Sequence, residues 1–536
     1  MQSPPNMIQG RIEGYAGKLS YEPGEELTLH LSSRGETDVC TVEIARIGRN
    51  REVVWSQNEV KVIHQPTPED AYARGCDWSA TLSFTLPAEW APGYYEVLFR
   101  ANGDEVLETP AFFVLRSAQS VTSPKILLVL TTNTYSAYND WGGNNLYTGG
   151  VQVSFERPIA PGLLRRPPGE LLRAATPHGT YDPELARQRD YIDRHKVSGW
   201  SAAAGWFNWE EPFVVWAEEN AIELDYAVSS DLELHPEVLD GKNLVLSVGH
   251  DEYWSWGMRD TLEQFVAEGG NVAFFSGNSV GWQVRLDDDG RTMTSYKYDA
   301  LTKDPVRDTD DRRFLTGCWS DPVIGRPENL LTGVSFTRGG YARVGYGVPR
   351  GTGGYSVWRP DHWVFEGTGL RYGDLVGSEN VVVGYEADGC EFVLSEDGLP
   401  RPTSKDGTPE TFTILATSPA RQWSNTPSFT DFPSNAALAE DEPGDLEFFA
   451  DRLFGSTDSS AARRLGHGNA VLGMYTKGGV VFTTGCTDWA YGLRGHDPLI
   501  ERITLNVIER LCAPTPADGP QEDQSPMHGN VGKGNT

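Results

Sequence analysis

Closely spaced cysteines are absent from this sequence. The six cysteines are scattered along the chain, at Cys40, Cys76, Cys318, Cys390, Cys486 and Cys512. Thiolate zinc sites and redox dithiols need CxxC-type spacing, so neither kind of site is indicated. Few and unpaired cysteines are typical of a reducing compartment, so we expect a cytoplasmic protein.

Long apolar runs and an excess of positive charge are also absent. No stretch of about 18 apolar residues occurs, and the first ten residues lack the basic and apolar segments of a signal peptide, so we expect neither a membrane span nor export. The chain has 45 Lys and Arg against 75 Asp and Glu, which gives a net charge of −30. Such a molecule repels phosphate backbones and anionic membranes, so nucleic acid and membrane surfaces are poor partners.

Several catalytic motifs are missing too. No GxGxxG or P-loop pattern is present, so nucleotide cofactors are not indicated. No GxSxG elbow follows a predicted strand, and His250-Asp-Glu252 occupies the place where an amidotransferase-like fold would carry its cysteine. Cys486 does follow a predicted strand, but we interpret it as a small packed residue.

Aromatic and apolar residues are abundant, with 16 Trp, 21 Tyr and 21 Phe. In the first part of the chain, apolar and polar residues alternate around positions 27–31, 42–44 and 82–86, and Pro-Gly turns separate these runs. Alternation of this kind, with no long helical pattern between the runs, predicts an Ig-like β-sandwich domain over residues 1–120.

After residue 120 the pattern becomes that of an α/β protein. Apolar runs at 125–130, 243–248, 271–275 and 479–483 predict buried strands, and 211–220, 258–268 and 499–511 have helical spacing. This repetition predicts a three-layer parallel-sheet catalytic domain, of amidotransferase or flavodoxin-like type, over residues 121–513. We expect a loop- and β-rich insertion at about 286–470 and a disordered tail over 514–536.

Polar and aromatic side chains directly follow the predicted strands. The segments after three of these strands are 131–147, 249–255 and 276–278. Ligands of open α/β sheets bind beyond the carboxyl ends of the strands, so these segments should converge. His250 and Glu252 are two residues apart and could form an ordinary hydrogen-bonded loop. At a strand end, however, Glu252 could bind a hard metal and His250 could orient a substrate or move a proton.

Tyr138 and Tyr147 flank a Trp-Gly-Gly turn in the first of these segments. One interpretation is that both are core or rim aromatics with satisfied hydroxyls. As metal ligands they would have to be phenolates. Because the tyrosine pKa is about 10, only a strongly Lewis-acidic cation such as ferric iron would keep two phenols ionised near neutral pH.

The order of several motifs resembles the catalytic region of the N,N-dimethylformamidase large-subunit family. Similar signatures run from about residue 125 to 285, and the preceding Gly14-Tyr-Ala-Gly-Lys-Leu-Ser20 is similar to the β-domain of many relatives. The motifs are Tyr135-Ser-Ala-Tyr-Asn139, Gly142-Gly143, Leu146-Tyr147, Ser154-Phe-Glu-Arg-Pro158, Gly249-His-Asp-Glu-Tyr-Trp254 and Ser276-Gly-Asn278.

The resemblance implies hydrolysis of a formamide C–N bond at a mononuclear iron, expected to be ferric, that is held by two tyrosines and one glutamate. By motif, Glu252 matches the carboxylate ligand and Tyr138 one phenolate. Tyr147 is the predicted second phenolate, with Tyr135 as its competitor.

The resemblance also assigns roles around the metal. His250 and Asn278 would bind substrate or support the ligands, and Glu386, in Gly384-Tyr-Glu-Ala-Asp-Gly389, fits the family's catalytic base. The sequence departs from the family at Asp251, where proline is common, and at Gly281, where an aromatic residue often stands. A small helical accessory subunit or a homo-oligomer is expected as partner.

Two other functions stay open. The aromatic loops could form the recognition surface of a non-catalytic carbohydrate- or protein-binding module. Alternatively, the same iron site could hydrolyse a larger or cyclic amide rather than a small formamide.

Overall fold

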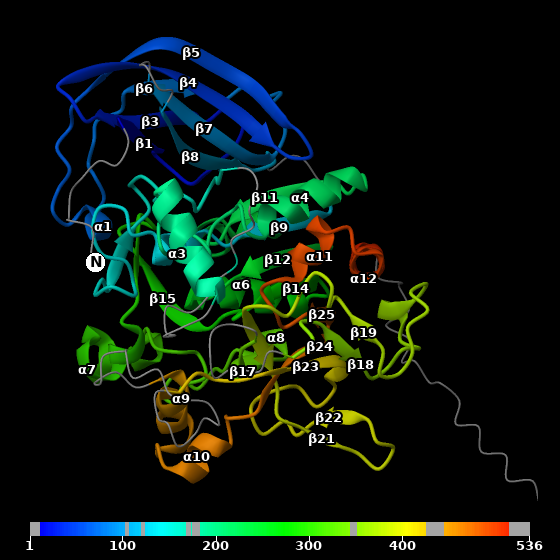
Figure 1. Cartoon of the computed structure of the whole chain (residues 1–536). Coiled ribbons are helices and arrows are strands. Elements are labelled where there is room, and N and C mark those ends of the chain that lie inside the picture. Colours follow the sequence, from blue (N-terminus) through cyan, green and yellow to red (C-terminus); the bar gives the residue numbers. More distant parts are fainter. Residues whose placement is uncertain are drawn as a thin grey trace, which may run out of the picture.

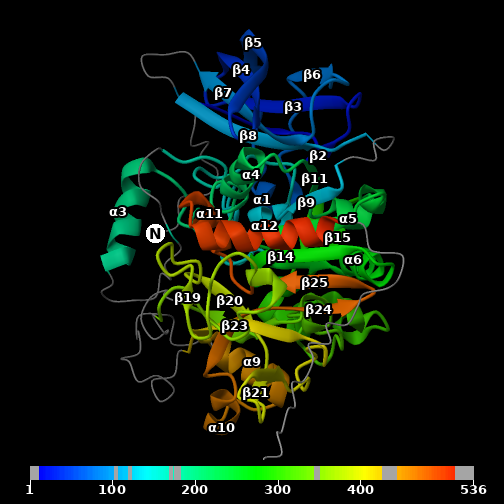
Figure 2. The same ribbon diagram turned by 90° about the vertical axis from the view of Figure 1, so that its right-hand side faces the viewer.

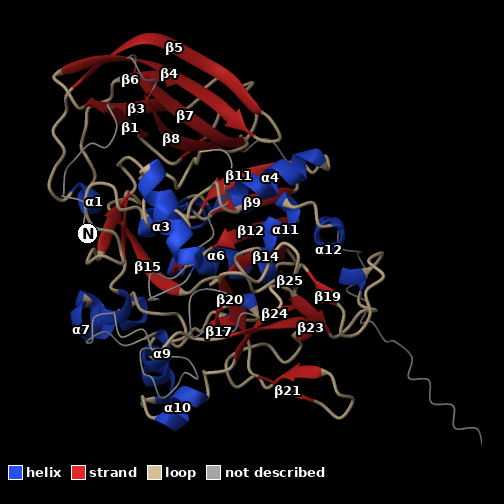
Figure 3. Cartoon of the chain, in the orientation of Figure 1, coloured by secondary structure: helices blue, strands red, loops and turns tan. Residues whose placement is uncertain are grey.

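The computed structural model describes residues 11–101, 107–118, 124–167, 173, 183–342, 351–424 and 444–513 (Figure 1). The fold is mixed α/β with several sheets, and strands predominate over helices (Figure 3). The predicted disordered tail, 514–536, lies outside the described residues. Among the described residues, no helix is long and apolar enough to cross a membrane.

The N-terminal part forms two sheets, drawn in blue at the top of Figure 1. A three-stranded sheet has the order β1 (Ile12–Ala16), β3 (Glu26–Ser33), β6 (Leu82–Thr85). A five-stranded sheet has the order β2 (Ser20–Tyr21), β8 (Leu107–Leu115), β7 (Gly93–Ala101), β4 (Thr37–Ile47), β5 (Arg51–Ile63). Alternating residues of both sheets, such as Leu27 and Leu29 on one and Val42 and Ile44 on the other, are buried in one shared core.

The five-stranded sheet also has a second buried face. Tyr94 and Phe112 on this face belong to the core of the α/β part, and the Tyr94 ring stacks on Trp206 with centroids 4.0 Å apart. The N-terminal strands are therefore packed onto the rest of the chain by aromatic contacts.

A nine-stranded sheet forms the centre of the molecule. Its order is β11 (Leu224–Val228), β9 (Ile126–Leu130), β12 (Leu244–His250), β14 (Asn271–Gly277), β25 (Gly479–Thr483), β24 (Gly468–Lys477), β23 (Thr413–Ala420), β18 (Tyr355–Val357), β19 (Leu375–Val376). The pairs from β11 to β25 are parallel, whereas the pairs from β25 to β19 are antiparallel.

The sheet is thus mixed, not wholly parallel as the sequence predicted. The physical reason is the tight turn at Gly478, which joins β24 directly to β25; so short a connection allows only an antiparallel pair. Strands β18, β19 and β23, which come from the segment predicted as an insertion, extend this same sheet. The domain boundaries themselves stay predictions.

Helices cover both faces of the parallel half (Figure 2). Leu128 and Leu246 point to the core shared with α4 (Glu210–Glu219), α11 (Trp489–Arg494) and α12 (Pro498–Cys512). The intervening Leu127 and Val245 point to the core shared with α5 (Asp231–Leu234) and α6 (Trp256–Ala267). Because successive side chains of a strand alternate between faces, uninterrupted apolar strands fit between two helical layers.

The remaining helices, 3-10 turns and small sheets complete the described part of the fold. The helices are α1 (Ala71–Arg74), α2 (Thr132–Tyr138), α3 (Pro183–His195), α7 (Ala300–Lys303), α8 (Asn329–Thr332), α9 (Asp445–Phe454) and α10 (Ser459–Arg463). The 3-10 turns are η1 (Pro236–Leu239), η2 (Lys297–Asp299), η3 (Pro305–Asp308), η4 (Arg312–Phe314) and η5 (Trp363–Phe365). The small sheets are β10 (Gln152–Ser154), β16 (Thr292–Thr294), β15 (Trp282–Asp287), β13 (Tyr253–Ser255); β17 (Ser335–Tyr341), β20 (Glu386–Gly389); and β21 (Phe392–Leu394), β22 (Pro400–Pro402).

Candidate active site

The segments after strands β9, β12 and β14 meet at one edge of the central sheet. Strands β12 and β14 are parallel neighbours in a register that places His250 opposite Gly277, so Glu252 and Asn278 both follow directly. Glu386 joins them from β20, because Ala387 forms an antiparallel bridge with Cys486 just after β25. The convergence expected at the carboxyl ends of the strands is therefore present.

Three oxygen-bearing side chains form the centre of this cluster. The hydroxyl of Tyr147 lies 2.7 Å from that of Tyr138 and 2.9 and 3.0 Å from the two carboxylate oxygens of Glu252. The Tyr138 hydroxyl donates to Glu252 Oε2 at 3.1 Å. The two tyrosines come from the segment after β9 and Glu252 from the segment after β12, and the structure brings together the three residues predicted as ligands.

Local hydrogen bonds fix the two tyrosines relative to each other. Tyr138 is the last residue of α2, and the Asn145 side chain donates to its carbonyl oxygen at 3.1 Å. The same Asn145 accepts from the Tyr147 amide at 2.9 Å, while the Leu146 amide donates to the Ala137 carbonyl. One asparagine thus ties the end of the helix to the loop that returns Tyr147.

Tyr135 lies in a different environment. Its ring packs 6.0 Å from Phe112, centroid to centroid, in the core beneath the N-terminal strands. Its phenol is close to the buried carboxyl of Glu210. The structure therefore brings Tyr138 and Tyr147, and not Tyr135, to Glu252.

His250, Glu386 and Asn278 form a second group beside the oxygens. His250 Nε2 lies 2.7 Å from Glu386 Oε2 and 3.3 Å from Glu252 Oε2, although neither contact has the angles of a hydrogen bond. Its Nδ1 contacts the Ala203 carbonyl at 2.8 Å, which assigns the Nδ1 proton. Asn278 Nδ2 donates to Glu386 Oε2 at 3.1 Å.

A glycine lets the histidine take this position. Gly249 has φ +84°, and a Cβ there would collide with the Cβ of Trp209. Only glycine combines that backbone conformation with so close an approach. A few residues further on, Ser255 accepts from the Met258 amide at 3.2 Å and caps α6.

Three residues of the site were not foreseen from the sequence. Trp282 Nε1 donates to Glu252 Oε1 at 2.7 Å, and the Tyr253 hydroxyl donates to that of Tyr147 at 2.8 Å. Lys297, which is 4% exposed, donates to the Tyr253 hydroxyl at 2.9 Å, and its ammonium lies 3.2 Å from the centroid of the Tyr147 ring. Lys297 gave no sequence signal, because lysines are rarely buried.

Burial and charge act in opposite directions on the ionisable groups. Burial raises the pKa of the Tyr138 and Tyr147 phenols well above 10, and the charge of Glu252 adds to this. Burial would also raise the pKa of Glu252, but contacts with His250, the charge of Lys297 and the hydrogen bond from Tyr147 outweigh it and lower that pKa. The carboxylate is therefore ionised, and the phenols stay protonated unless a cation is present.

Positive charge is held against this carboxylate. Burial tends to lower the pKa of His250, but Glu386 and Glu252 raise it well above 6.5. Burial lowers the pKa of Lys297 to about 8, in spite of the attraction of Glu252. Two basic groups thus lie beside the Glu252 carboxylate at the edge of the sheet.

The donor set fits a hard, highly charged cation. The three oxygens are separated by 2.7 to 3.1 Å. An ion about 2.0 Å from each of three octahedral oxygens needs them roughly 2.8 Å apart, so little rearrangement would be required. Within the described ranges, no group of three or more His, Cys, Asp and Glu side chains is arranged to hold a metal; here two of the donors are phenols.

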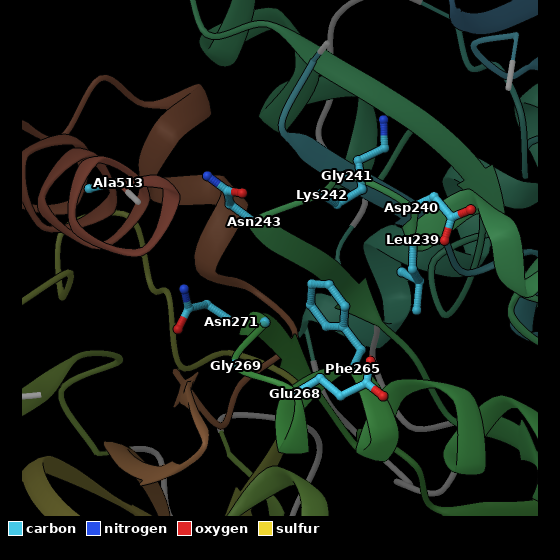
Figure 4. A pocket seen from close by; sticks show the side chains of 11 residues that line it. Leu239, Asp240, Gly241, Lys242, Asn243, Phe265, Glu268, Gly269, Asn271 and Ala513 are labelled. Atoms are coloured by element: carbon cyan, nitrogen blue, oxygen red, sulfur yellow. The ribbon is translucent and has the colours of Figure 1, made fainter. Parts of the chain in front are cut away.

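A pocket lies at the opposite ends of the same strands. Its lining includes Lys242, Asn243 and Asn271 at the amino ends of β12 and β14, together with Glu268 after α6 (Figure 4). Asn243 and Asn271 donate to carbonyl oxygens at the end of α12. These contacts cap a helix, and none of the predicted site residues lines this pocket.

Comparison with known proteins identifies the family of this chain. A family profile described as "N,N-dimethylformamidase beta subunit-like, C-terminal" matches residues 41–501. The chain belongs to this family, and the resemblance seen in its motifs is confirmed.

Two curated relatives carry the name "N,N-dimethylformamidase beta subunit". The protein from Alcaligenes sp is 24% identical over 516 residues, and that from Paracoccus aminophilus is 24% identical over 525 residues. Each alignment covers 86% of this chain and 59% of the relative. The chain therefore spans less than two thirds of the length of these relatives, whose names indicate amide hydrolysis by an enzyme of more than one subunit.

Proposed function

We propose that this protein hydrolyses the C–N bond of a small amide, such as a formamide, to a carboxylic acid and an amine, at a mononuclear ferric iron. Tyr138, Tyr147 and Glu252 would hold the iron. The observation that carries the proposal is the meeting of one buried phenol, one half-buried phenol and one ionised carboxylate within 3.1 Å. Phenolate and carboxylate oxygens are hard ligands that suit a trivalent cation.

The iron, when bound, would supply Lewis acidity that polarises the amide carbonyl. The protein's own groups would manage the proton. Glu386 would accept a proton from the attacking water on its carboxylate and return it to the leaving nitrogen, so that acid and amine are both formed. Its Oε2 is oriented by the Asn278 amide at 3.1 Å.

His250 would bridge the side chains of Glu252 and Glu386. Its Nδ1 is anchored on the Ala203 carbonyl, so Nε2 faces both Glu252 and Glu386. Asn278, with its remaining amide hydrogen, would position the amide substrate or the oxyanion. Burial of the whole group excludes competing water and strengthens each of these interactions.

The proposal also covers the type of each domain and the partner of the chain. We expect the two N-terminal sheets to act as an Ig-like sandwich and the parallel half of the central sheet to act as a flavodoxin-like catalytic layer. The relatives are named as beta subunits, which favours an accessory subunit as partner; a homo-oligomer stays the alternative.

The test combines metal analysis with a substrate series. Purified protein should contain iron and show a visible tyrosinate-to-iron absorbance band, and it should release amine from N-substituted formamides. If amine is released only from larger or cyclic amides, the proposed substrate class would be wrong and the proposed iron site would stand. Absence of iron and of the band would overturn the metal assignment, and an iron-loaded protein that cleaves no amide would instead favour a binding module.

A further inference from the structure

The turn that presents Asn278 is strained. Asn278 has φ +46° and Val280 has φ +60°, and neither is a glycine. Left-handed backbone of this kind is disfavoured for residues with a Cβ, above all for a β-branched valine, and persists only where neighbours hold it. The strained turn places the Asn278 side-chain amide 3.1 Å from Glu386 Oε2.

Asp388 holds this turn from the side of Glu386. Its Oδ2 accepts from the Ser279 amide at 3.0 Å, and the side chain is 1% exposed. Asp388 stands two residues after Glu386 on β20, so both carboxyls point to the same face of that strand. The Asp388 amide in turn donates to the Gly485 carbonyl at 3.0 Å, which fixes β20 beside the central sheet.

A chain of hydroxyls holds the same turn from the other side. Ser279 Oγ lies 2.9 Å from Ser276 Oγ, which lies 2.9 Å from Ser247 Oγ, and Ser247 donates to Asp251 Oδ2 at 2.7 Å. All three hydroxyls are buried. The carbonyl of Asp251 also accepts from the Val280 amide at 2.8 Å. Buried polar groups therefore form hydrogen bonds with the turn on both sides.

We propose that Asp388 is a positioning residue, which holds the strained turn 278–280 and so keeps the Asn278 amide on Glu386. Asp388 bonds to the turn at the Ser279 amide and so acts on the site through Asn278. The inference rests on the proposed function only in that Asn278 and Glu386 act on the substrate.

The conservative variant follows from the burial of this carboxyl. Burial raises the pKa of Asp388 to about 8. Near neutral pH the group is therefore mostly a neutral carboxylic acid whose carbonyl oxygen accepts the Ser279 hydrogen bond. Asp388→Asn keeps that acceptor, whereas Asp388→Leu removes it at similar volume.

A matched control is available at Asp231. Its Oδ2 also accepts from a backbone amide, that of Val228, at 2.9 Å, and it is equally buried. It follows β11, the edge strand of the sheet, which β9 separates from β12. Asp231→Leu should lower stability and leave the Asn278 turn intact.

The first measurement is hydrogen exchange of the peptide that contains Ser279. Asp388→Leu should speed exchange of the Ser279 amide by about tenfold or more, and Asp388→Asn and Asp231→Leu should leave it protected. Unchanged protection in Asp388→Leu would overturn the proposal. This readout needs no amidase activity, so it separates a failure of the positioning role from a failure of the proposed function. If Asp388→Leu does not fold, Asp388→Ala makes the same test.

The second measurement is a double-variant cycle on amide hydrolysis. Asp388→Leu should lower kcat by roughly 10- to 100-fold with little change in KM, because a misplaced group beside the reacting atoms acts on the chemical step. Asp388→Asn should retain most of the wild-type kcat. In the Asn278→Ala background the same change should have almost no further effect; losses that multiply would show that Asp388 acts independently of Asn278 and would overturn the proposal.

Discussion

Trp282→Phe removes the indole hydrogen bond to the predicted iron ligand Glu252 and leaves an aromatic ring at this position. The indole Nε1 donates to Glu252 Oε1 at 2.7 Å in a site where Trp282 is 4% exposed. A phenylalanine ring keeps the contacts with Tyr298 and Phe448, whose ring centroids lie 5.1 and 6.0 Å away. The ligand would lose the donor that orients its carboxylate.

The expected loss can be estimated from this contact. A hydrogen bond to a charged group contributes about 1.5–3 kcal/mol. A loss of about 2 kcal/mol is roughly a 30-fold change in an equilibrium constant, and loss of a partner of a metal ligand commonly weakens affinity by about 10- to 100-fold. We therefore expect Trp282→Phe to bind iron about 30-fold more weakly, with the phenolate band still present at saturation.

The assay is competition for iron against a chelator of known affinity. The visible phenolate-to-iron band reports how much iron the protein holds. The control is Trp254→Phe. Trp254 is 2% exposed, and its Nε1 donates at 2.9 Å to Asp251, the neighbouring carboxyl that is not a predicted ligand. Equal iron affinity in Trp282→Phe and the wild type, or an equal loss in Trp254→Phe, would refute the reasoning.

Three further outcomes follow from the geometry. Lys297→Met, which keeps the length but removes the ammonium beside Tyr147, should strengthen iron binding by about tenfold or more in the same competition, because a positive charge opposes a cation bound next to it; unchanged or weaker affinity would refute a role for this charge. Tyr135→Phe should retain iron on metal analysis, whereas Tyr147→Phe should lose it; the reverse pattern would exchange the two assignments. Burial raises the pKa of Glu210 from 4.5 to about 7, so its contribution to stability is complete below pH 4.5 and is lost as the pH rises through 7. In urea unfolding, the free energy of unfolding of Glu210→Gln relative to that of the wild type should therefore rise by roughly 3 kcal/mol from pH 4.5 to pH 8. A difference that does not change with pH would contradict this.

Much of the central sheet could be predicted from the sequence. The apolar runs at 243–248 and 271–275 correspond to β12 and β14, and the helices predicted at 211–220 and 499–511 correspond to α4 and α12. Strands buried on both faces leave an uninterrupted apolar signal. The antiparallel half was not predicted, because β18, β19 and β23 are short or irregular and pair across long stretches of chain.

The site was predictable only in part, for a related reason. His250, Glu252 and Asn278 directly follow recognisable strands, so topology alone predicts that they converge. Tyr147 came from the family resemblance, since its place depends on the side-chain contacts of Asn145. Trp282 reaches Glu252 through the short pairing of β13 with β15, which has no periodic sequence signal.

The central claim is that Glu252 and two phenols hold iron, and Glu252→Ala tests it most directly. Glu386→Gln is the control, because Glu386 lies 2.7 Å from the same histidine but is predicted to move a proton and not to bind metal. Iron analysis and the visible spectrum should show stoichiometric iron and the phenolate band in the wild type and in Glu386→Gln, and neither in Glu252→Ala. Full iron occupancy in Glu252→Ala, or a wild-type protein without iron, would contradict the account.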